Sequence, residues 1–153
     1  MSDIKQILDH AEASCRKNGV KFTQKRRRVL TGLLTSQKAQ SAYELVDYMR
    51  EEFGETLPPT TMYRILNFLA SENLAHKLHI ANKYVACSHI SCGHTHEIPQ
   101  FLICDNCNNV KEIGIKKTFI NTLKNNVEEA DYFLKSPQIE LHCLCKDCAT
   151  IAA

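Results

Sequence analysis

The first half of the chain alternates amphipathic segments with short polar breaks. In residues 3–17, apolar side chains recur at helical spacing, which predicts a helix that ends near Gly19. A second helix is expected from Thr23 to about Leu34, because a threonine side chain can accept a backbone N–H of the first helical turn. Each of these helices has one apolar face to bury.

A capping box predicts the start of a third helix. Ser41 and Glu44 stand three residues apart, so each side chain can bind the backbone N–H of the other residue. The buried face of this helix is expected to consist of Leu45, Val46, Met49 and Phe53. Pro58 and Pro59 prevent the helix from continuing further.

A fourth helix is predicted after the two prolines. Thr60 or Thr61 can cap it, and it extends to about Ser71. Its buried positions are expected to be Ile65, Leu66 and Leu69. Two strand-like stretches follow, "LAHKLHI" and "KYVAC", joined by a turn at Ala81 and Asn82. Short helices followed by a hairpin predict a winged helix-turn-helix, in which the hairpin is the wing.

The second half has the pattern of a small mixed domain. The stretches "QFLIC" and "VKEIGI" predict strands, and residues 117–128 predict a helix. The stretch "YFLKSPQIELHCL" predicts a strand that is bent or interrupted around Pro137. Strands with one helix packed on them form an α+β domain. The expected fold class is therefore α+β, with a winged helix-turn-helix over residues 1–82, a hinge over 83–92 and a second domain over 93–153.

The composition is that of an ordinary globular protein, with 44% apolar and 24% charged residues. No apolar run approaches the length of a membrane-spanning helix, and "MSDIKQILDH" lacks the charged-then-apolar order of a signal peptide. We therefore expect a cytoplasmic protein without a membrane partner.

The charge is unevenly distributed along the chain. Residues 1–80 carry twelve Lys and Arg against nine Asp and Glu, whereas residues 81–153 carry seven against eight. The run "KRRR" from Lys25 to Arg28 dominates the basic half. This bias favours nucleic acid only weakly, because many solvated helix faces have the same composition.

Eight cysteines indicate metal binding or thiol chemistry rather than disulfides, because the cytoplasm keeps thiols reduced. Two pairs have CxxC spacing, with Cys104 and Cys107 in "CDNC" and Cys145 and Cys148 in "CKDC". Such a turn aims both sulfurs at one ion, and two turns complete the tetrahedral thiolate set of a structural zinc. The alternative is a pair of redox motifs, which the absence of a thioredoxin-like βαβ pattern weakens.

The positions of the cysteines indicate which of them bind metal and which belong to the core. The two pairs are separated by 37 residues, so a small domain is expected between them, closed by the metal. Ile139, Leu141 and Cys143 share one face of a strand, so Cys143 is interpreted as a core residue. Cys15 lies on the apolar stripe of the first helix and is interpreted in the same way.

A second, mixed cluster of candidate ligands lies between the two halves. It consists of His76, His79, Cys87, His89, Cys92, His94 and His96, followed by Glu112. Imidazole, thiolate and carboxylate donors together suit zinc, whereas an iron site more plausibly uses nitrogen and oxygen donors only. Ligands from both domains on one ion would fix the angle between the domains. Chance clustering of surface residues is the alternative.

The chain resembles the ferric uptake regulator family, and most closely its zinc uptake regulator branch. The motifs that carry the resemblance are "FTQKRRRVL", "SAYELVDYMR", "PPTTMYRILNFL", "LAHKLHIANKYVAC", "HTHEIPQFLICDNCNNVKE" and "HCLCKDC". They run in order from about residue 12 to residue 148. The resemblance implies a homodimeric, zinc-responsive repressor of zinc uptake genes. Its N-terminal winged helix would bind palindromic operator DNA, and its C-terminal domain would be the α/β dimerisation domain.

The resemblance also implies two zinc ions per subunit. The structural zinc falls on Cys104, Cys107, Cys145 and Cys148. The regulatory zinc falls on His76, Cys87, His96 and Glu112. The loop "SHISCGHTHEIP" is about one residue longer than usual in this family, so His94 can substitute for His96. For the same reason His89 or Cys92 can hold an extra metal.

The fourth helix is the expected reader of the DNA major groove. Its polar face carries Thr61, Tyr63, Arg64 and Asn67. Arg64 can donate two hydrogen bonds to guanine, and Tyr63 resembles the family residue that packs on thymine, with core packing as its alternative role. Phosphate contacts are expected from Lys25, Arg26 and Arg28.

Other function classes compete with a zinc-responsive repressor. A peroxide sensor and an iron or manganese sensor of the same fold are the nearest alternatives. A zinc hydrolase or deaminase is disfavoured, because neither HExxH nor H-x-E with P-C-x-x-C occurs in the chain. Four protein ligands also leave no position open for a catalytic water. We therefore do not expect an enzyme.

Overall fold

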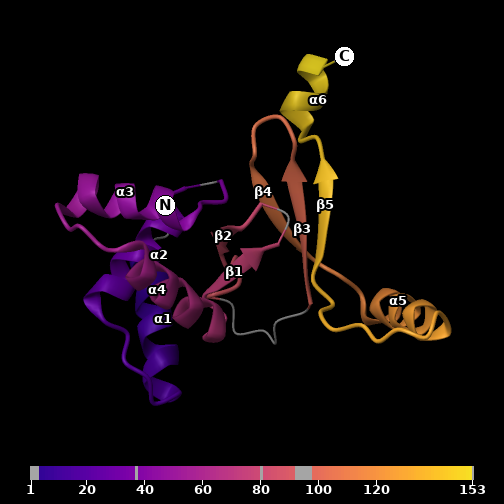
Figure 1. Ribbon diagram of the computed structural model, residues 1–153, viewed down its shortest axis with the longest axis horizontal. Coiled ribbons are helices and arrows are strands. Elements are labelled where there is room, and N and C mark those ends of the chain that lie inside the picture. The colour runs from indigo at the N-terminus through magenta and orange to yellow at the C-terminus, as the bar shows by residue number, and fades with distance from the viewer. Residues whose placement is uncertain (1–3, 37, 80, 92–97, 153) are drawn as a thin grey trace. The chain divides into compact units, whose positions relative to one another are not determined.

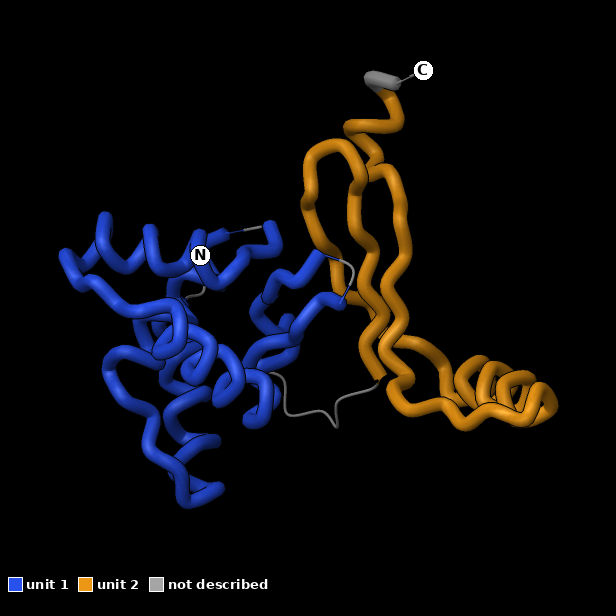
Figure 2. The backbone as a smooth tube through the Cα atoms, viewed as in Figure 1, with its two compact units in different colours: residues 1–93 blue, residues 94–153 orange. Residues whose placement is uncertain are grey.

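The computed structural model describes residues 4–36, 38–79, 81–91 and 98–152. The chain divides into two compact units, residues 1–93 and residues 94–153, which Figure 2 shows in blue and orange. The predicted hinge over residues 83–92 stays a prediction. Among the described residues, no helix is both long enough and apolar enough to cross a membrane.

Unit 1 begins with the four predicted helices (Figure 1). They are α1 (Ile4–Lys17), α2 (Gln24–Thr35), α3 (Ala42–Phe53) and α4 (Pro59–Ser71). The Thr23 side chain accepts the backbone N–H of Arg26 at 3.3 Å, which confirms the predicted cap of α2. Ser41 and Glu44 form the predicted capping box, with N–O distances of 2.8 Å and 3.2 Å. These caps satisfy N–H groups that a helix start leaves without an intrahelical partner.

The prediction for the start of α4 was wrong. Pro58 is its N-cap and Pro59 its first residue, with no side-chain cap from either threonine. Proline suits this position because it has no N–H to satisfy and its φ already matches the helix. The preceding helix, α3, ends before the prolines, because Gly54 adopts a left-handed conformation with φ of 61°.

The predicted wing is confirmed. Strands β1 (Ala75–Leu78) and β2 (Lys83–Ala86) pair antiparallel, and Asn82 in the turn has φ of 49°. Asparagine tolerates this conformation better than most residues. A further bridge joins Gln40 to Tyr84, so the segment before α3 lies along the hairpin. Helices followed by this hairpin form the expected winged-helix arrangement.

The core of unit 1 is built from the inward faces of all four helices and the wing. The predicted buried positions Ile65, Leu66 and Leu69 of α4 are buried, and Tyr84 of the wing is 2% exposed. Cys15 is fully buried, which confirms it as a core residue. Burial also raises the pKa of its thiol, which opposes formation of the reactive thiolate.

Gly32 allows α2 to approach the ring of Tyr48 on α3. A Cβ at this position would lie 2.8 Å from two ring carbons of Tyr48 and 3.3 Å from a methyl carbon of Leu45. We expect Gly32→Ala to lower the free energy of unfolding by about 1 kcal/mol, because overpacking costs more than the gain in helix propensity. Chemical denaturation measures this change. A variant more stable than the wild type would contradict the close packing.

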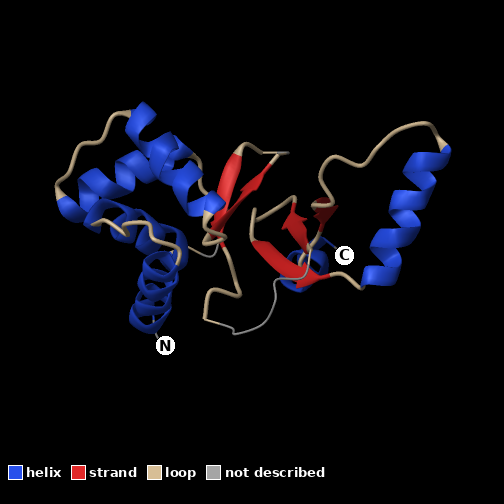
Figure 3. Cartoon of the chain, turned by 90° about the horizontal axis from the view of Figure 1, so that it is seen from below, coloured by secondary structure: helices blue, strands red, loops and turns tan. Residues whose placement is uncertain are grey.

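The described part of unit 2 contains a three-stranded sheet and two helices (Figure 3). Its elements are β3 (Pro99–Cys104), β4 (Val110–Gly114), α5 (Lys117–Glu129), β5 (Ile139–Cys143) and α6 (Lys146–Ala152). The strand order is β4-β3-β5, with β4 antiparallel and β5 parallel to β3. The two units together confirm the α+β fold class.

The sequence predictions for the last third of the chain need three corrections. The predicted strand before Pro137 does not form, since residues 132–138 contain no strand. The short helix α6 was not predicted. In addition, Cys143 is only half-buried and Leu141 is exposed. The interpretation of Cys143 as a core residue was therefore wrong. The face of β5 that carries Ile139, Leu141 and Cys143 is therefore apolar but only partly covered.

Candidate metal centre and nucleic-acid interface

The sheet of unit 2 brings the two CxxC pairs together. Because β5 runs parallel to β3 with Cys143 opposite Cys104, both strands end at the same edge. Cys104 is the last residue of β3, and Cys107 lies in the turn that follows. Cys145 is the second residue after β5, directly before α6, and Cys148 lies in the first turn of α6. The sulfur atoms of Cys104, Cys107, Cys145 and Cys148 all lie within 4.8 Å of one another.

These four sulfurs have the spacing of a tetrahedral metal site. The sulfurs of Cys107 and Cys145 lie 3.8 Å apart. A tetrahedron with Zn–S bonds of about 2.3 Å has edges of about 3.8 Å. The donor set and its geometry therefore fit a zinc ion, which would supply charge neutralisation and a cross-link rather than catalysis.

Hydrogen bonds to the sulfurs orient two of the ligands. The backbone N–H of Cys145 donates to the sulfur of Cys104 at 3.4 Å, and the Asn106 side-chain amide donates to the sulfur of Cys148 at 3.3 Å. Backbone N–H groups of Cys107 and Cys145 favour the thiolate and lower the pKa of Cys104 to about 6. Such outer contacts fix ligand orientation in metal sites.

The thiols of this cluster oppose each other's ionisation. The Asn106 amide lowers the pKa of Cys148, but the neighbouring Cys145 thiol and burial outweigh it, and the pKa of Cys148 rises to about 12. Four adjacent thiolates are therefore unfavourable by themselves. A divalent cation removes this conflict, because metal ligation requires the deprotonated form of every cysteine.

A second candidate ligand set includes residues of the wing. His76 lies in the middle of β1 and the buried Cys87 directly follows β2, and their ligand atoms lie within 4.8 Å of each other. The backbone N–H of Cys87 donates to the Leu74 carbonyl at 2.9 Å, which holds the residue against the hairpin. Its sulfur accepts the backbone N–H of His89 at 3.4 Å.

The other predicted ligands of this set lie in several different parts of the chain. Glu112 lies in β4 of unit 2, opposite Phe101 of β3. His89 lies in the turn after Cys87. The predicted ligands Cys92, His94 and His96 lie outside the described residues.

The predicted DNA-reading residues lie on the face of α4 that is turned away from the core. Arg64 and Asn67 are exposed, and Thr61 is half-buried. Tyr63 is also half-buried and packs against the core cluster, so its ring has both a core contact and an accessible part. The helix thus offers polar side chains on one face while the opposite face is buried.

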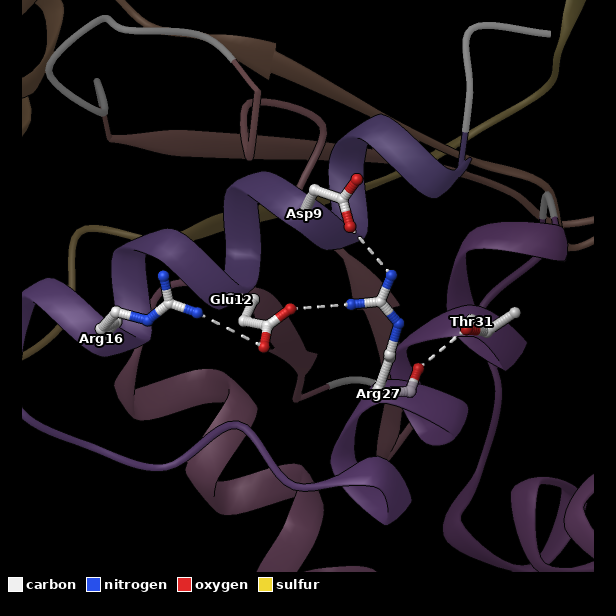
Figure 4. A network of polar contacts seen from close by, with 5 residues as sticks. All are labelled: Asp9, Glu12, Arg16, Arg27 and Thr31. Atoms are coloured by element: carbon white, nitrogen blue, oxygen red, sulfur yellow. Dashed lines mark hydrogen bonds and ion pairs between the residues drawn. The ribbon is translucent and has the colours of Figure 1, made fainter.

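Arg27, the residue of the basic run that was not assigned to DNA, is bound by α1 (Figure 4). Its guanidinium donates to Asp9 at 3.0 Å and to Glu12 at 3.2 Å, and Glu12 also pairs with Arg16 at 3.7 Å. These pairs join α1 to α2. They leave Arg27 with its charge already compensated.

The three basic residues assigned to DNA also have partners within unit 1. Lys25 and Arg28 share the carboxylate of Glu55, at 3.6 Å and 3.0 Å. The guanidinium of Arg26 lies 3.6 Å from the centroid of the Phe68 ring on α4. This contact joins α2 directly to the predicted DNA-reading helix.

Comparison with known proteins agrees with this combination of a winged helix and a cysteine cluster. The zinc uptake regulation protein of Escherichia coli (strain K12) is 35% identical over 150 residues, which cover 97% of this chain and 84% of the relative. Residues 17–142 match the ferric uptake regulator family. This chain belongs to the ferric uptake regulator family. It is therefore a metal-responsive transcription regulator and not an enzyme.

Two solved structures are similar to nearly the whole chain. A structure described as a zinc uptake regulator complexed with zinc and DNA has a TM-score of 0.85 and 28% identity, with 99% of each chain covered. The crystal structure of holo XcZur has a TM-score of 0.78 and 31% identity, covering 94% of this chain and 96% of that one.

Two features of the site were missed in the sequence. Asn106 inside "CDNC" is a side-chain donor to the opposite cysteine pair, and only its place within the motif hints at this role. Glu55 lies after α3 and pairs with residues 27 and 30 positions earlier in the chain, which no local pattern reveals. Both depend on tertiary contacts.

Proposed function

We propose that this chain is a zinc-responsive repressor that controls zinc uptake genes by binding palindromic operator DNA as a homodimer. The observation that carries the proposal is the buried thiol of Cys87 beside His76 on the wing. A thiolate among the ligands of the sensing site favours zinc over iron or manganese. The names of the E. coli relative and of the zinc- and DNA-bound structure agree with this choice.

The proposed metal content is two Zn²⁺ per subunit. The structural ion would be held by Cys104, Cys107, Cys145 and Cys148. The regulatory ion would be held by His76, Cys87, His96 and Glu112, with His94 as a substitute for His96, and His89 or Cys92 as an extra site. Residues of both units contribute to the regulatory set, so occupancy would restrain one unit relative to the other. DNA and zinc would then strengthen each other's binding, because the coupling is reciprocal.

In the proposed complex, α4 enters the major groove. Arg64 would donate to guanine, Tyr63 would pack on thymine, and Thr61 and Asn67 would contact neighbouring base edges. Lys25, Arg26 and Arg28 would contact phosphates, which position the protein and make its affinity fall with salt. The exposure of Arg64 and Asn67 supports this orientation of the helix.

The proposed homodimer uses unit 2. Tyr132 and Phe133 after α5 are 72% and 87% exposed, and Phe119 of α5 and Leu141 of β5 are exposed as well. Figure 1 shows α5 beside one end of the sheet rather than over its face. Apolar surface of this kind is typical of protein interfaces, and a second copy of the chain would cover it. A palindromic operator requires a two-fold symmetric protein.

Metal analysis combined with a DNA-binding titration tests the proposed function. The operator would first be selected from random duplexes at saturating zinc, and binding would then be measured across buffered free zinc. We expect two tightly bound zinc ions per chain and binding that zinc switches on. Binding that responds to Fe²⁺ but not to zinc, or that hydrogen peroxide abolishes at fixed zinc, would favour an iron or peroxide sensor instead.

A further inference from the structure

One carboxylate in unit 1 holds two of the cations that were assigned to DNA phosphates. The Glu55 side chain pairs with Lys25 through one oxygen at 3.6 Å and with Arg28 through the other at 3.0 Å. Arg28 also lies 4.8 Å from the centroid of the Phe53 ring. Each oxygen of the carboxylate therefore pairs with one cation, in the way that two oxygens of a DNA phosphate could.

The backbone around Glu55 is held in place. Gly54 ends α3 in a left-handed conformation with φ of 61°, and the N–H of Glu55 donates to the Met49 carbonyl at 3.2 Å. Leu57 is buried two residues later, and α4 starts at Pro59. The carboxylate thus belongs to a fixed connection between α3 and the proposed recognition helix.

We propose that Glu55 limits sequence-independent DNA binding by occupying Lys25 and Arg28 in the free protein. The inference rests on the proposed function, because it requires that unit 1 binds DNA. Each phosphate contact that either cation makes must first displace the carboxylate. Glu55 therefore weakens the electrostatic attraction that acts on any duplex, without touching the base-reading face of α4.

The burial of Glu55 makes this competition effective. The side chain of Glu55 is only 22% exposed, so water and salt screen its pairs less than those of a fully exposed carboxylate. Arg27, between the two cations in sequence, is compensated separately by Asp9 and Glu12 on α1. Three of the four cations in the basic run thus have carboxylate partners within unit 1, and two of them share the single negative charge of Glu55.

The test compares Glu55→Gln with Glu52→Gln in the full-length, zinc-loaded protein. Both changes remove one negative charge, but Glu52 is exposed on α3 and makes no ion pair within the described part of the chain. The probe is a labelled duplex of scrambled sequence, titrated at several salt concentrations. For Glu55→Gln we expect tighter binding at low salt and a slope of log K against log salt steeper by about 0.9 for each cation released, up to about 1.8.

The same titration in a Lys25→Gln/Arg28→Gln background separates release of the cations from a general change of charge or fold. There the effect of Glu55→Gln should fall to that of Glu52→Gln. Equal slopes for Glu55→Gln and Glu52→Gln, weaker binding by Glu55→Gln, or an effect in the double variant that still exceeds that of Glu52→Gln would overturn the inference. Each of these results leaves the proposed function intact if the wild type binds its operator in response to zinc. A wild type that binds no duplex at any salt concentration contradicts both.

Discussion

Cys145→Ser is expected to release the structural metal and to unfold unit 2. Zinc held by four cysteines contributes on the order of 10–16 kcal/mol in small peptides, which is comparable to the whole stability of a domain. Unit 2 has little else to replace it, since its buried apolar side chains among the described residues are Phe101, Ile103, Ile115 and Ile120. Serine does not provide the thiolate that this site requires.

Zinc content and thermal unfolding measure the effect of Cys145→Ser. We expect the loss of one zinc per chain and a separate, low-temperature unfolding transition of unit 2, while the helices of unit 1 persist. Cys143→Ser is the matched control, because Cys143 lies two residues away and is not one of the four clustered cysteines. If Cys145→Ser retained its metal and its unfolding temperature, the cysteine cluster would not be a structural metal site.

Cys87→Ser is expected to abolish zinc-dependent operator binding while leaving a folded dimer. Shifting a two-state equilibrium from 1:99 to 99:1 takes about 5.5 kcal/mol of differential affinity, and the proposed zinc ligands must supply it together. Removing the thiolate should therefore cost most of an effect that can reach about 10⁴-fold. The fold should survive, because the loss of one buried contact costs about 1–3 kcal/mol.

The loss of zinc-dependent binding is measured as operator affinity over a range of buffered free zinc concentrations. Circular dichroism shows whether the variant is folded. His79→Gln is the control, since His79 is exposed in the turn of the same hairpin and is not among the proposed ligands. A Cys87→Ser variant with an unaltered zinc response would remove Cys87 from the sensing site. A variant that fails to fold would show that Cys87 is needed for the core of unit 1 instead.

The parts of the fold that were predicted correctly depend on short stretches of chain. The cap at Thr23, the capping box at Ser41 and the turn at Asn82 each involve residues within three positions of one another. The four-cysteine cluster was also predictable, because the spacing within each CxxC pair already restricts what the two sulfurs can bind.

One error was local, and the other features that were missed depend on contacts between distant parts of the chain. The threonines after Pro59 are good caps in isolation, but a proline at the first position starts the helix earlier. The apolar stretch before Pro137 has strand-like residues, yet Tyr132 and Phe133 remain exposed rather than paired in the sheet. The pairing of Glu55 with Lys25 and Arg28 brings residues from α2 and the end of α3 together, and no periodicity encodes it.

The parallel pairing of β3 with β5 has a consequence for how the C-terminal unit can evolve. With both CxxC pairs at one edge of the sheet, the 37 residues between them form a closed excursion that carries β4, α5 and β5. Closure entropy rises only by about 0.6 kcal/mol when such a loop doubles in length. Insertions and deletions around α5 therefore change the free energy of loop closure only slightly. The length of this segment can vary while the four-cysteine cluster that closes it stays unchanged.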